Sequence, residues 1–389
     1  MLEGVKSHRI LTSLLVGMCL MPFVSFAAAP LDDNAMREMI HGGVTWLLHA
    51  EEKNGHFRYE YVPYEDRYLA NDNIVRQAGA FYVLGEVGRR DTKNVYQLEK
   101  PLRTSLGYFE KQSVKGKFEK QTFRCVVGEE ESSCQIGTTA LVLVGLLDFI
   151  ERYPSYVRTY LPLVHDYVSY LETMKKTNAG FRNYYAIRSN KQSEEESFFG
   201  NGEAFLALAR YHLYSQNSTT KKMIIDTFTY VSKQRPFDEN LYLWVMAALK
   251  DLEKKEPNTA YVSYVEDYTK WRLADRARYM STHNSCPYME GIASAYSVLQ
   301  DGNDMALRMK LRTTLETMLL TSSGLQIKKE NLYRYIEGRG IEKLGNPQKA
   351  EGGFLTGLTA KELTQRIDFT QHCVSSYVQT LIDIRGGSL

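Results

Sequence analysis

The chain has 389 residues, of which 43% are hydrophobic and 24% are charged, and its formal net charge is +2. This composition is typical of a globular protein, with length enough for one large domain or two ordinary ones. Because there is no basic excess and no long block of like charges, the sequence does not indicate binding to nucleic acid. Tyrosine is frequent, at 27 residues, and rings with a polar tip suit ligand clefts as well as helix packing.

The N-terminal segment has the pattern of an export signal. A short basic region precedes an apolar run over residues 10–26, and Ser25-Phe26-Ala27 fits a small-x-small cleavage site. We therefore predict that residues 1–27 are a signal peptide and that residues 28–389 form a single domain, periplasmic or secreted, in a bacterium. A retained anchor is the alternative, although the run is marginal for a membrane span and Pro22 interrupts it. We expect no stable membrane span after cleavage.

Two kinds of helix are predicted to alternate along the rest of the chain. One kind is apolar on nearly every side and rich in small residues, and its six stretches begin at Ile74, Ile136, Phe198, Asn240, Tyr288 and Phe369. The other kind is amphipathic, and its six stretches lie at about 33–50, 94–112, 155–175, 219–233, 258–279 and 304–321. Gly55, Gly116 and Gly180 follow the first three amphipathic helices and are predicted to stop them. No convincing strand alternation is found, although short hairpins in the loops remain open.

A helix that is apolar all round must be covered all round. If the six hairpins close into a ring, the apolar helices form an inner barrel and the amphipathic helices form an outer ring around it. This hairpin count, and the inner-helix texture G-E-A-F-L-A-L-A-R over residues 202–210, resembles the α/α-toroid superfamily, the six-hairpin (α/α)6 barrel, and is closest in texture to its glycan-active members. The resemblance covers essentially all of residues 28–389 and predicts an all-α fold, without a family-specific catalytic motif. An open α-solenoid of the same hairpins is the alternative.

The predicted connections differ in length at the two ends of the ring. Those from an amphipathic helix to the next apolar helix are mostly long, and the return connections are short. The long loops would gather over the N-termini of the apolar helices, where binding and chemistry concentrate on a rigid scaffold and where helix dipoles favour polar ligands. Glycan-active toroids hold their cleft at this end, so the resemblance implies a cleft here.

Two carboxylates stand out at that end. Glu203 and Glu290 each lie about one turn inside an apolar helix, where a charge must face a cavity or find a partner. We predict that they are the catalytic acid and base, with His372 as an alternative base. A structural ion pair for the glutamates and a satisfied core histidine for His372 are the alternatives. Substrate binding is assigned to polar and aromatic residues of the same rim, since stacking rings and guanidinium forks suit sugars: Asp72, Arg76, Asn201, Tyr184 and Tyr288.

Four cysteines remain after residue 27. An even number in an oxidising compartment favours disulfides, and the short polar loop between Cys125 and Cys134 makes that pair easy to close. Cys286 and Cys373 would then form the second bridge. A zinc site built from these two cysteines with His372 and His283 is the alternative, although the spacing matches no compact zinc pattern. We predict no metal site and no cofactor.

These predictions describe an exported carbohydrate-active enzyme, a hydrolase, lyase or epimerase that acts on an oligosaccharide or acidic polysaccharide. Its expected partner is a glycan or other small polar ligand. One alternative is a non-catalytic periplasmic toroid that binds a glycan, peptide or lipid. Another is a zinc-dependent toroid resembling lanthionine cyclases or prenyltransferases, whose ligand spacings are not reproduced in this sequence. The residues do not indicate an oligomeric state.

Overall fold

The protein is described from a computed structural model, which covers residues 30–128, 132–275, 281, 283–330, 332–336, 338–359 and 363–389. The predicted signal peptide, residues 1–27, lies outside the described residues. Leu31–Leu389 form one unit, and the account below concerns that unit. Among its described residues, no helix combines the length and the apolar character that crossing a membrane requires.

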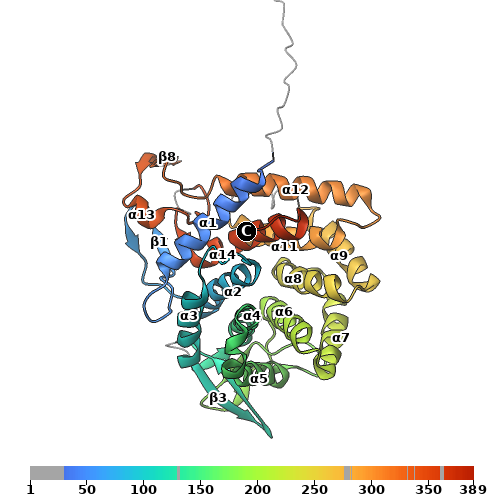
Figure 1. The fold of residues 1–389 in the computed structure, drawn as a ribbon. Helices are drawn as coiled ribbons and strands as arrows, with labels where there is room; N and C mark the ends of the chain where they lie inside the picture. The colour runs from blue at the N-terminus through green and yellow to red at the C-terminus, as the bar shows by residue number, and fades with distance from the viewer. Residues whose placement is uncertain are drawn as a thin grey trace, which may run out of the picture. The chain divides into compact units, whose positions relative to one another are not determined.

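Six helices form a closed inner ring (Figure 1). They are α2 (Ile74–Arg90), α4 (Ile136–Arg152), α6 (Phe198–Ser215), α8 (Glu239–Lys255), α11 (Ser285–Leu299) and α14 (Ile367–Gln379). Each packs against the next in this order, and α14 packs against α2. The contact between the last and first inner helices closes the barrel, which confirms the predicted toroid and excludes the open solenoid.

Six further helices surround the barrel. They are α1 (Asp33–Ala50), α3 (Glu99–Lys111), α5 (Val157–Met174), α7 (Ser218–Ser232), α9 (Thr259–Arg272) and α12 (Met305–Ser323). Helices α3, α5 and α9 each pack against the inner helices that precede and follow them in the chain. Helix α7 packs against α6, α12 against α11 and α1 against α14. This covering explains the all-round apolar inner helices: in α4, every residue from 136 to 150 is buried.

Polar side chains cap the N-termini of many of these helices, at the residues where a polar loop gives way to an apolar helix. Asn73 accepts hydrogen bonds from the backbone N–H groups of Val75 and Arg76 at the start of α2. Ser197 accepts one from Gly200 at the start of α6, and Asp238 caps α8 in the same way. Such caps satisfy N–H groups that the first turn leaves without partners.

The long loops lie over the N-termini of the inner helices, as predicted, and they carry short strands. Strands β1 (Glu60–Val62) and β2 (Arg67–Tyr68) join β10 (Gln365–Arg366), and β5 (Ser133–Gln135) joins β6 (Tyr184–Ala186) and β7 (Lys191–Gln192). Two hairpins complete the set: β3 (Ser113–Phe118) with β4 (Gln121–Val126), and β8 (Tyr333–Ile336) with β9 (Gly340–Lys343). The remaining short elements are α13 (Pro347–Ala350), a 3-10 turn at Pro154–Tyr156 and a π-helical turn at Thr380–Ile384.

The predicted role of the three glycines as helix stops is wrong in all three cases. Gly55 has a φ of 90°, but it comes after α1 has ended at Ala50. Gly116 lies within β3, paired with Phe123, whose ring would clash with a side chain at residue 116. At the third position the left-handed residue is Ala179 rather than Gly180. The glycines therefore shape the loops rather than terminate the helices.

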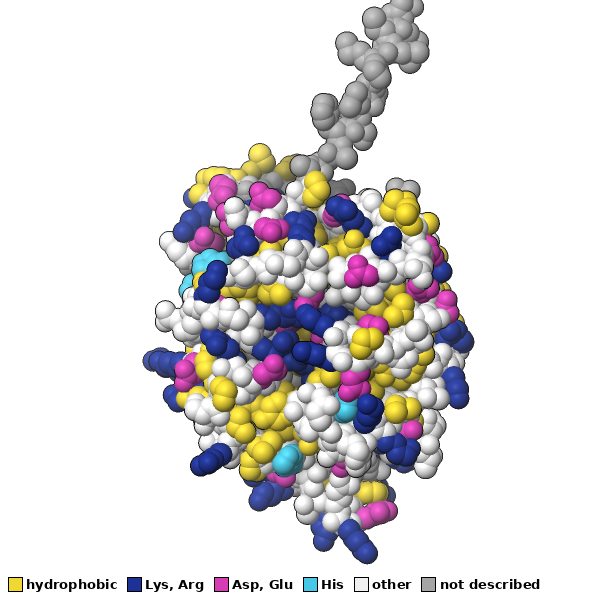
Figure 2. All heavy atoms as spheres, turned by 45° about the vertical axis from the view of Figure 1, so that its right-hand side comes forward, with side chains coloured by type: hydrophobic (Ala, Val, Ile, Leu, Met, Phe, Trp, Pro, Cys, Tyr) yellow, Lys and Arg dark blue, Asp and Glu magenta, His cyan; other side chains and the backbone are white. Residues whose placement is uncertain are grey.

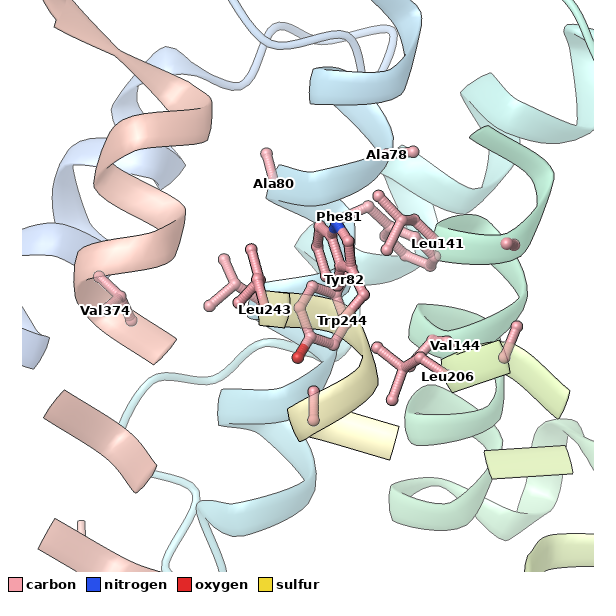
Figure 3. Packing of buried hydrophobic residues seen from close by; sticks show 14 of the residues in the cluster. Ala78, Ala80, Phe81, Tyr82, Leu141, Val144, Leu206, Leu243, Trp244 and Val374 are labelled. Atoms are coloured by element: carbon pink, nitrogen blue, oxygen red, sulfur yellow. The ribbon is translucent and has the colours of Figure 1, made fainter. Parts of the chain in front are cut away.

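The middle of the barrel is filled by side chains from facing helices. Tyr82 of α2 and Trp244 of α8 lie together between the inner helices, with ring centroids 6.2 Å apart, and Leu141, Val144 and Leu206 lie on one side of them (Figure 3). Figure 2 shows that hydrophobic side chains are scattered over the surface, whereas Lys and Arg side chains gather around a central hollow. Because side chains fill the centre of the barrel, its open space lies at its ends.

Candidate active site

A cavity of about 280 Å³ lies where the six inner helices begin. Every inner helix contributes to its wall, either from its first turns or from the residue that precedes it. Examples, one from each helix in chain order, are Arg76, Gln135, Glu203, Asn240, Tyr288 and His372. The cavity is therefore a product of ring closure, and an open array of the same hairpins would not form it.

His372 of α14 and Glu290 of α11 form a hydrogen-bonded pair at one side of the cavity. The Nδ1 atom of His372 lies 2.6 Å from Oε2 of Glu290, which is fully buried. A carboxylate at this distance accepts the Nδ1 proton, so Nε2 is the ring nitrogen left to exchange a proton with a ligand. The imidazole lines the cavity, and no described residue pairs with Nε2. The pair has the arrangement of a general base held by a carboxylate.

Glu203 of α6 lies on the opposite helix of the ring. Its side chain lines the cavity but is only 4% exposed. No hydrogen bond or ion pair to it is found among the described residues. Burial raises the pKa of Glu203 to about 8, because removal from water disfavours the charged form. The side chain is therefore a protonated acid near neutral pH, able to donate a hydrogen bond or a proton.

Glycine at residue 137 makes room for this carboxyl group. A Cβ atom there would lie 1.8 Å from Oε2 of Glu203. Gly137 is the second residue of α4, whose neighbouring positions are all buried. The close approach of α4 and α6 thus sets the position of the acid.

A cationic cluster lies beside His372. Arg366 donates two hydrogen bonds to Asp368, at 3.0 and 2.6 Å, and Nε of Arg76 lies 3.2 Å from the same carboxylate. Burial alone would raise the pKa of Asp368, but Arg366, Arg76 and His372 together hold it below its usual range. Arg76 also donates to the hydroxyl group of Tyr59. Two guanidinium groups share one carboxylate, so the cluster keeps a positive charge and N–H groups for a ligand.

Aromatic side chains form the floor and part of the rim. Trp244 lines the cavity, with its ring centroid 5.8 Å from that of His372. Phe199, in the first turn of α6, is 48% exposed at the mouth. Tyr288 also lines the wall, and the guanidinium group of Arg272 lies 4.4 Å from the centroid of its ring. Flat apolar faces combined with polar groups are typical of sites that bind sugars.

Solved structures of similar fold support this architecture. A D-mannose isomerase matches with a TM-score of 0.63 and 11% identity, covering 91% of this chain and 100% of the other. A sugar epimerase from a ruminal bacterium matches with a TM-score of 0.63 and 9% identity, covering 92% of this chain and 100% of the other. A third match is an inactive variant of an α-1,6-mannanase from Salegentibacter, in complex with α-1,6-mannotriose. Its TM-score is 0.59 and its identity 9%, and the match covers 89% of this chain and 98% of the other. No family model and no curated protein matches this chain.

The chain is an (α/α)6 toroid. The inner ring and the extent of these matches decide the fold, since the similar structures span almost the whole chain. At these identities the likeness establishes the fold alone. The chemistry of this toroid must therefore be argued from its own residues.

The toroid brings together four of the predicted site residues at the cavity: Arg76, Glu203, Tyr288 and His372. Glu290 does not line it, and lies behind His372 as its hydrogen-bond partner. It therefore positions the imidazole, rather than acting directly as the acid or base we predicted.

Three predicted substrate-binding residues lie outside the cavity wall. Asp72 accepts one hydrogen bond from the side chain of Gln77 and pairs with His56. The Oδ1 atom of Asn201 accepts from the backbone N–H of Phe181, 2.8 Å away, so its amide holds a loop. Tyr184 lies in β6, paired with Gln135. We leave these three out of the proposed site.

The four cysteines form the two predicted disulfides, Cys125–Cys134 and Cys286–Cys373. With their sulfur atoms bonded to each other, Cys286 and Cys373 offer no thiolate to a zinc ion. Within the described part of the chain, no group of three or more His, Cys, Asp or Glu side chains is placed to hold a metal ion.

Sequence reasoning missed several residues of the wall. In the sequence, Trp244 is one more apolar residue of an inner helix, so nothing indicates that its side chain lines the cavity. Arg366 carries a usable signal, because it stands two residues before Asp368 at a predicted helix start. Phe199 stands at the start of the third apolar helix, where an aromatic side chain is ordinary core.

Proposed function

We propose that this toroid is a carbohydrate-active enzyme that performs acid–base chemistry on a saccharide in the cavity. The observation that carries the proposal is the placement of a histidine base and a protonated carboxylic acid on opposite helices of one cavity. The enzymes of similar fold, a mannose isomerase, a sugar epimerase and a mannanase, act on saccharides, which supports the substrate class.

His372 is the proposed general base. Its Nε2 atom accepts a proton from the substrate, and Glu290 stabilises the imidazolium ion that forms. Glu203 is the proposed general acid and donates a proton from the other side. Arg76 orients the substrate through N–H groups that its contacts with Asp368 and Tyr59 leave over. A base on one helix and an acid on the opposite helix can act on the two sides of one bound saccharide.

Sugar epimerisation or isomerisation fits this arrangement best. Epimerisation removes a proton from the carbon next to a carbonyl group and returns one to the opposite face of that carbon, whereas isomerisation returns one to the neighbouring carbon. A base and an acid on opposite sides of the cavity can carry out either exchange. Glycoside hydrolysis is the second candidate, because a carboxylic acid with a raised pKa is the usual proton donor to a leaving oxygen. In that reaction His372 would activate a water molecule. Turnover of different saccharides by the purified protein will identify the substrate.

The test is turnover of a panel of reducing neutral and acidic saccharides. NMR in D2O detects deuterium incorporation for epimerisation or isomerisation, and a reducing-end assay detects hydrolysis. We expect His372→Asn and Glu203→Gln each to lower kcat about 10²-fold or more, the range for general acid–base groups. Tyr335→Ala, a change of an exposed aromatic residue on β8, is the matched control and should keep full activity. Turnover that survives both site variants, or a panel left unchanged by the wild type, would refute the proposal.

We also propose that the enzyme is exported and that residues 1–27 are removed. The two disulfides support this, because such bonds persist in oxidising compartments. N-terminal sequencing of the protein recovered from the periplasm or medium should begin at Ala28. Recovery of the intact N-terminus in the membrane fraction would instead support the retained anchor.

A further inference from the structure

A second hollow, of about 620 Å³, adjoins the catalytic cavity. Glu239, the first residue of α8, belongs to the walls of both. Arg272 of α9 lines the second hollow, while Tyr288, over whose ring it lies, lines the first. The two spaces are therefore separated by side chains that line one or both of them.

Arg272 is a buried cation with unused donors. It is only 4% exposed, and its Nε atom and one terminal nitrogen have no hydrogen-bond partner among the residues that the structure describes. Leaving guanidinium N–H groups buried and unpaired is costly. Since the group stands in the wall of the hollow, a ligand with oxygen acceptors there would satisfy those donors.

The other walls combine flat aromatic faces with carboxylates. Trp271 is 38% exposed and its ring centroid lies 5.7 Å from that of Phe237. Phe237 is stacked on Tyr268 with centroids 4.2 Å apart, which holds its ring in place. Asp238 and Glu239 supply carboxylate oxygens at the rim of the same hollow. These carboxylates accept hydrogen bonds from hydroxyl groups, and they repel an anionic ligand.

We infer that this hollow binds an uncharged pyranose ring of an oligosaccharide, next to the sugar that reacts in the cavity. Trp271 stacks on one face of the ring, Arg272 donates to its hydroxyl oxygens, and the carboxylates accept from its hydroxyl groups. The substrate is accordingly a chain of sugars that leaves the cavity over the start of α8 towards the end of α9. This inference rests on the proposed function and names the substrate class and one of its subsites.

The test is the dependence of binding on chain length. The probes are α-1,6-linked manno-oligosaccharides and β-1,4-linked gluco-oligosaccharides, from monosaccharide to hexasaccharide, titrated against the full chain by calorimetry. We expect affinity in one series to rise about tenfold or more between the monosaccharide and the trisaccharide. Trp271→Ala should remove about fivefold to tenfold of this gain, the range for one aromatic contact, and leave monosaccharide affinity unchanged.

Three further variants separate the outcomes. Trp271→Phe should keep most of the gain, Arg272→Gln should lose it, and the control Tyr335→Ala should behave as wild type. His372→Asn should lose turnover but keep the gain with chain length, so failure of catalysis is distinguished from failure of the subsite. Equal affinity for every chain length, or a gain that Trp271→Ala leaves intact, would overturn the inference. Binding of neither series would overturn it as well.

Discussion

Glu203 shows how burial alone can set the protonation state of a side chain. The carboxyl group has no described partner, and burial raises its pKa from 4.5 to about 8. The folded protein therefore holds a proton on Glu203 between these two pH values, whereas the unfolded chain does not. By linkage, folding stability must fall as pH rises through this window.

The first prediction is that Glu203→Gln stabilises the protein in a pH-dependent way. The wild type has the full stability of a neutral side chain below about pH 4.5 and loses it progressively up to about pH 8. At about 1.4 kcal/mol per pH unit, the loss at pH 8 is roughly 4 kcal/mol. The glutamine variant avoids this loss, so its advantage in urea unfolding should be large at pH 8 and absent at pH 4.5. Glu119→Gln, a change at an exposed residue, is the control. An advantage independent of pH would contradict the assignment.

The second prediction concerns the glycine against which the acid rests. A methyl group at residue 137 would overlap Oε2 of Glu203, so Gly137→Ala should displace the carboxyl group and lower kcat/KM about 10²-fold, the cost of a small misplacement. Gly107→Ala, in α3 where nothing lies within 4 Å, is the matched control. It should keep activity and gain about 0.5–1 kcal/mol in stability from higher helix propensity. Full activity of Gly137→Ala would argue against Glu203 as the acid.

At the scale of elements, the disulfide Cys286–Cys373 joins the two helices that carry the catalytic pair. Cys286 lies four residues before Glu290 in α11, and Cys373 follows His372 in α14. Because residues four apart lie on one helix face, the bond fixes the approach of the two helices near the Nδ1–Oε2 contact.

The third prediction follows from that connection. The double variant Cys286→Ser and Cys373→Ser should lower the free energy of unfolding by about 2–4 kcal/mol and kcat by about tenfold, because the helices are freer to shift. Cys125→Ser with Cys134→Ser removes the other bond, which joins loop strands. That control should cost stability but leave kcat close to wild type. Equal kcat for both double variants would show that the first disulfide has no positioning role.

The helices could be predicted because each requires a pattern of its own. The inner helices need apolar and small residues on all sides, so their starts at Ile74, Ile136 and Phe198 were placed at the residues where α2, α4 and α6 begin. The hairpin of β3 and β4 was missed, although Phe123 and Cys125 alternate with polar residues in the way a strand requires. Its six-residue strands lie in a loop, where such alternation is short.

The site could be predicted only in part. The sequence shows how far along a helix a residue lies, but it does not show which side of that helix faces the cavity. Asn201 and Glu203 are two residues apart, which is about 200° around a helix. Both belong to the first turns of α6, but Glu203 faces the cavity while Asn201 holds the loop at Phe181. Direction is set by packing against α4 and α8, which the sequence does not display.

At the scale of the whole molecule, closing the ring brings the C-terminal segment against the first inner helix. Asp383 is 4% exposed in its side chain and accepts two hydrogen bonds from Arg90 of α2, at 2.9 and 2.7 Å. Lys250 and Lys254 of α8 lie 3.5 and 3.2 Å from the same carboxylate. One aspartate thus links the last turn of the chain to two helices across the end of the barrel opposite the cavity.

The fourth prediction is that Asp383→Asn weakens closure of the ring. Burial alone would raise the pKa of Asp383, but Lys250, Arg90 and Lys254 hold it well below its usual range. This stability is present above about pH 4, the ordinary aspartate pKa, and is lost as pH falls towards the lowered one. Removing the charge leaves the buried cations Arg90 and Lys250 with only their longer contacts to Glu86 and Asp251, so the variant should lose about 3 kcal/mol at pH 7.

The measurement is urea unfolding of the wild type and Asp383→Asn at pH 7 and at progressively lower pH. The difference should shrink as the wild-type carboxylate takes up a proton. Asp33→Asn is the control, because Asp33 and Arg385 also join the two ends of the folded unit but form an exposed pair, 3.0 Å apart. An exposed pair of this kind contributes about 1 kcal/mol or less. If both variants lost equally little, closure of the ring would depend on the apolar contact of α14 with α2 alone, and the buried ion pairs would add nothing to it.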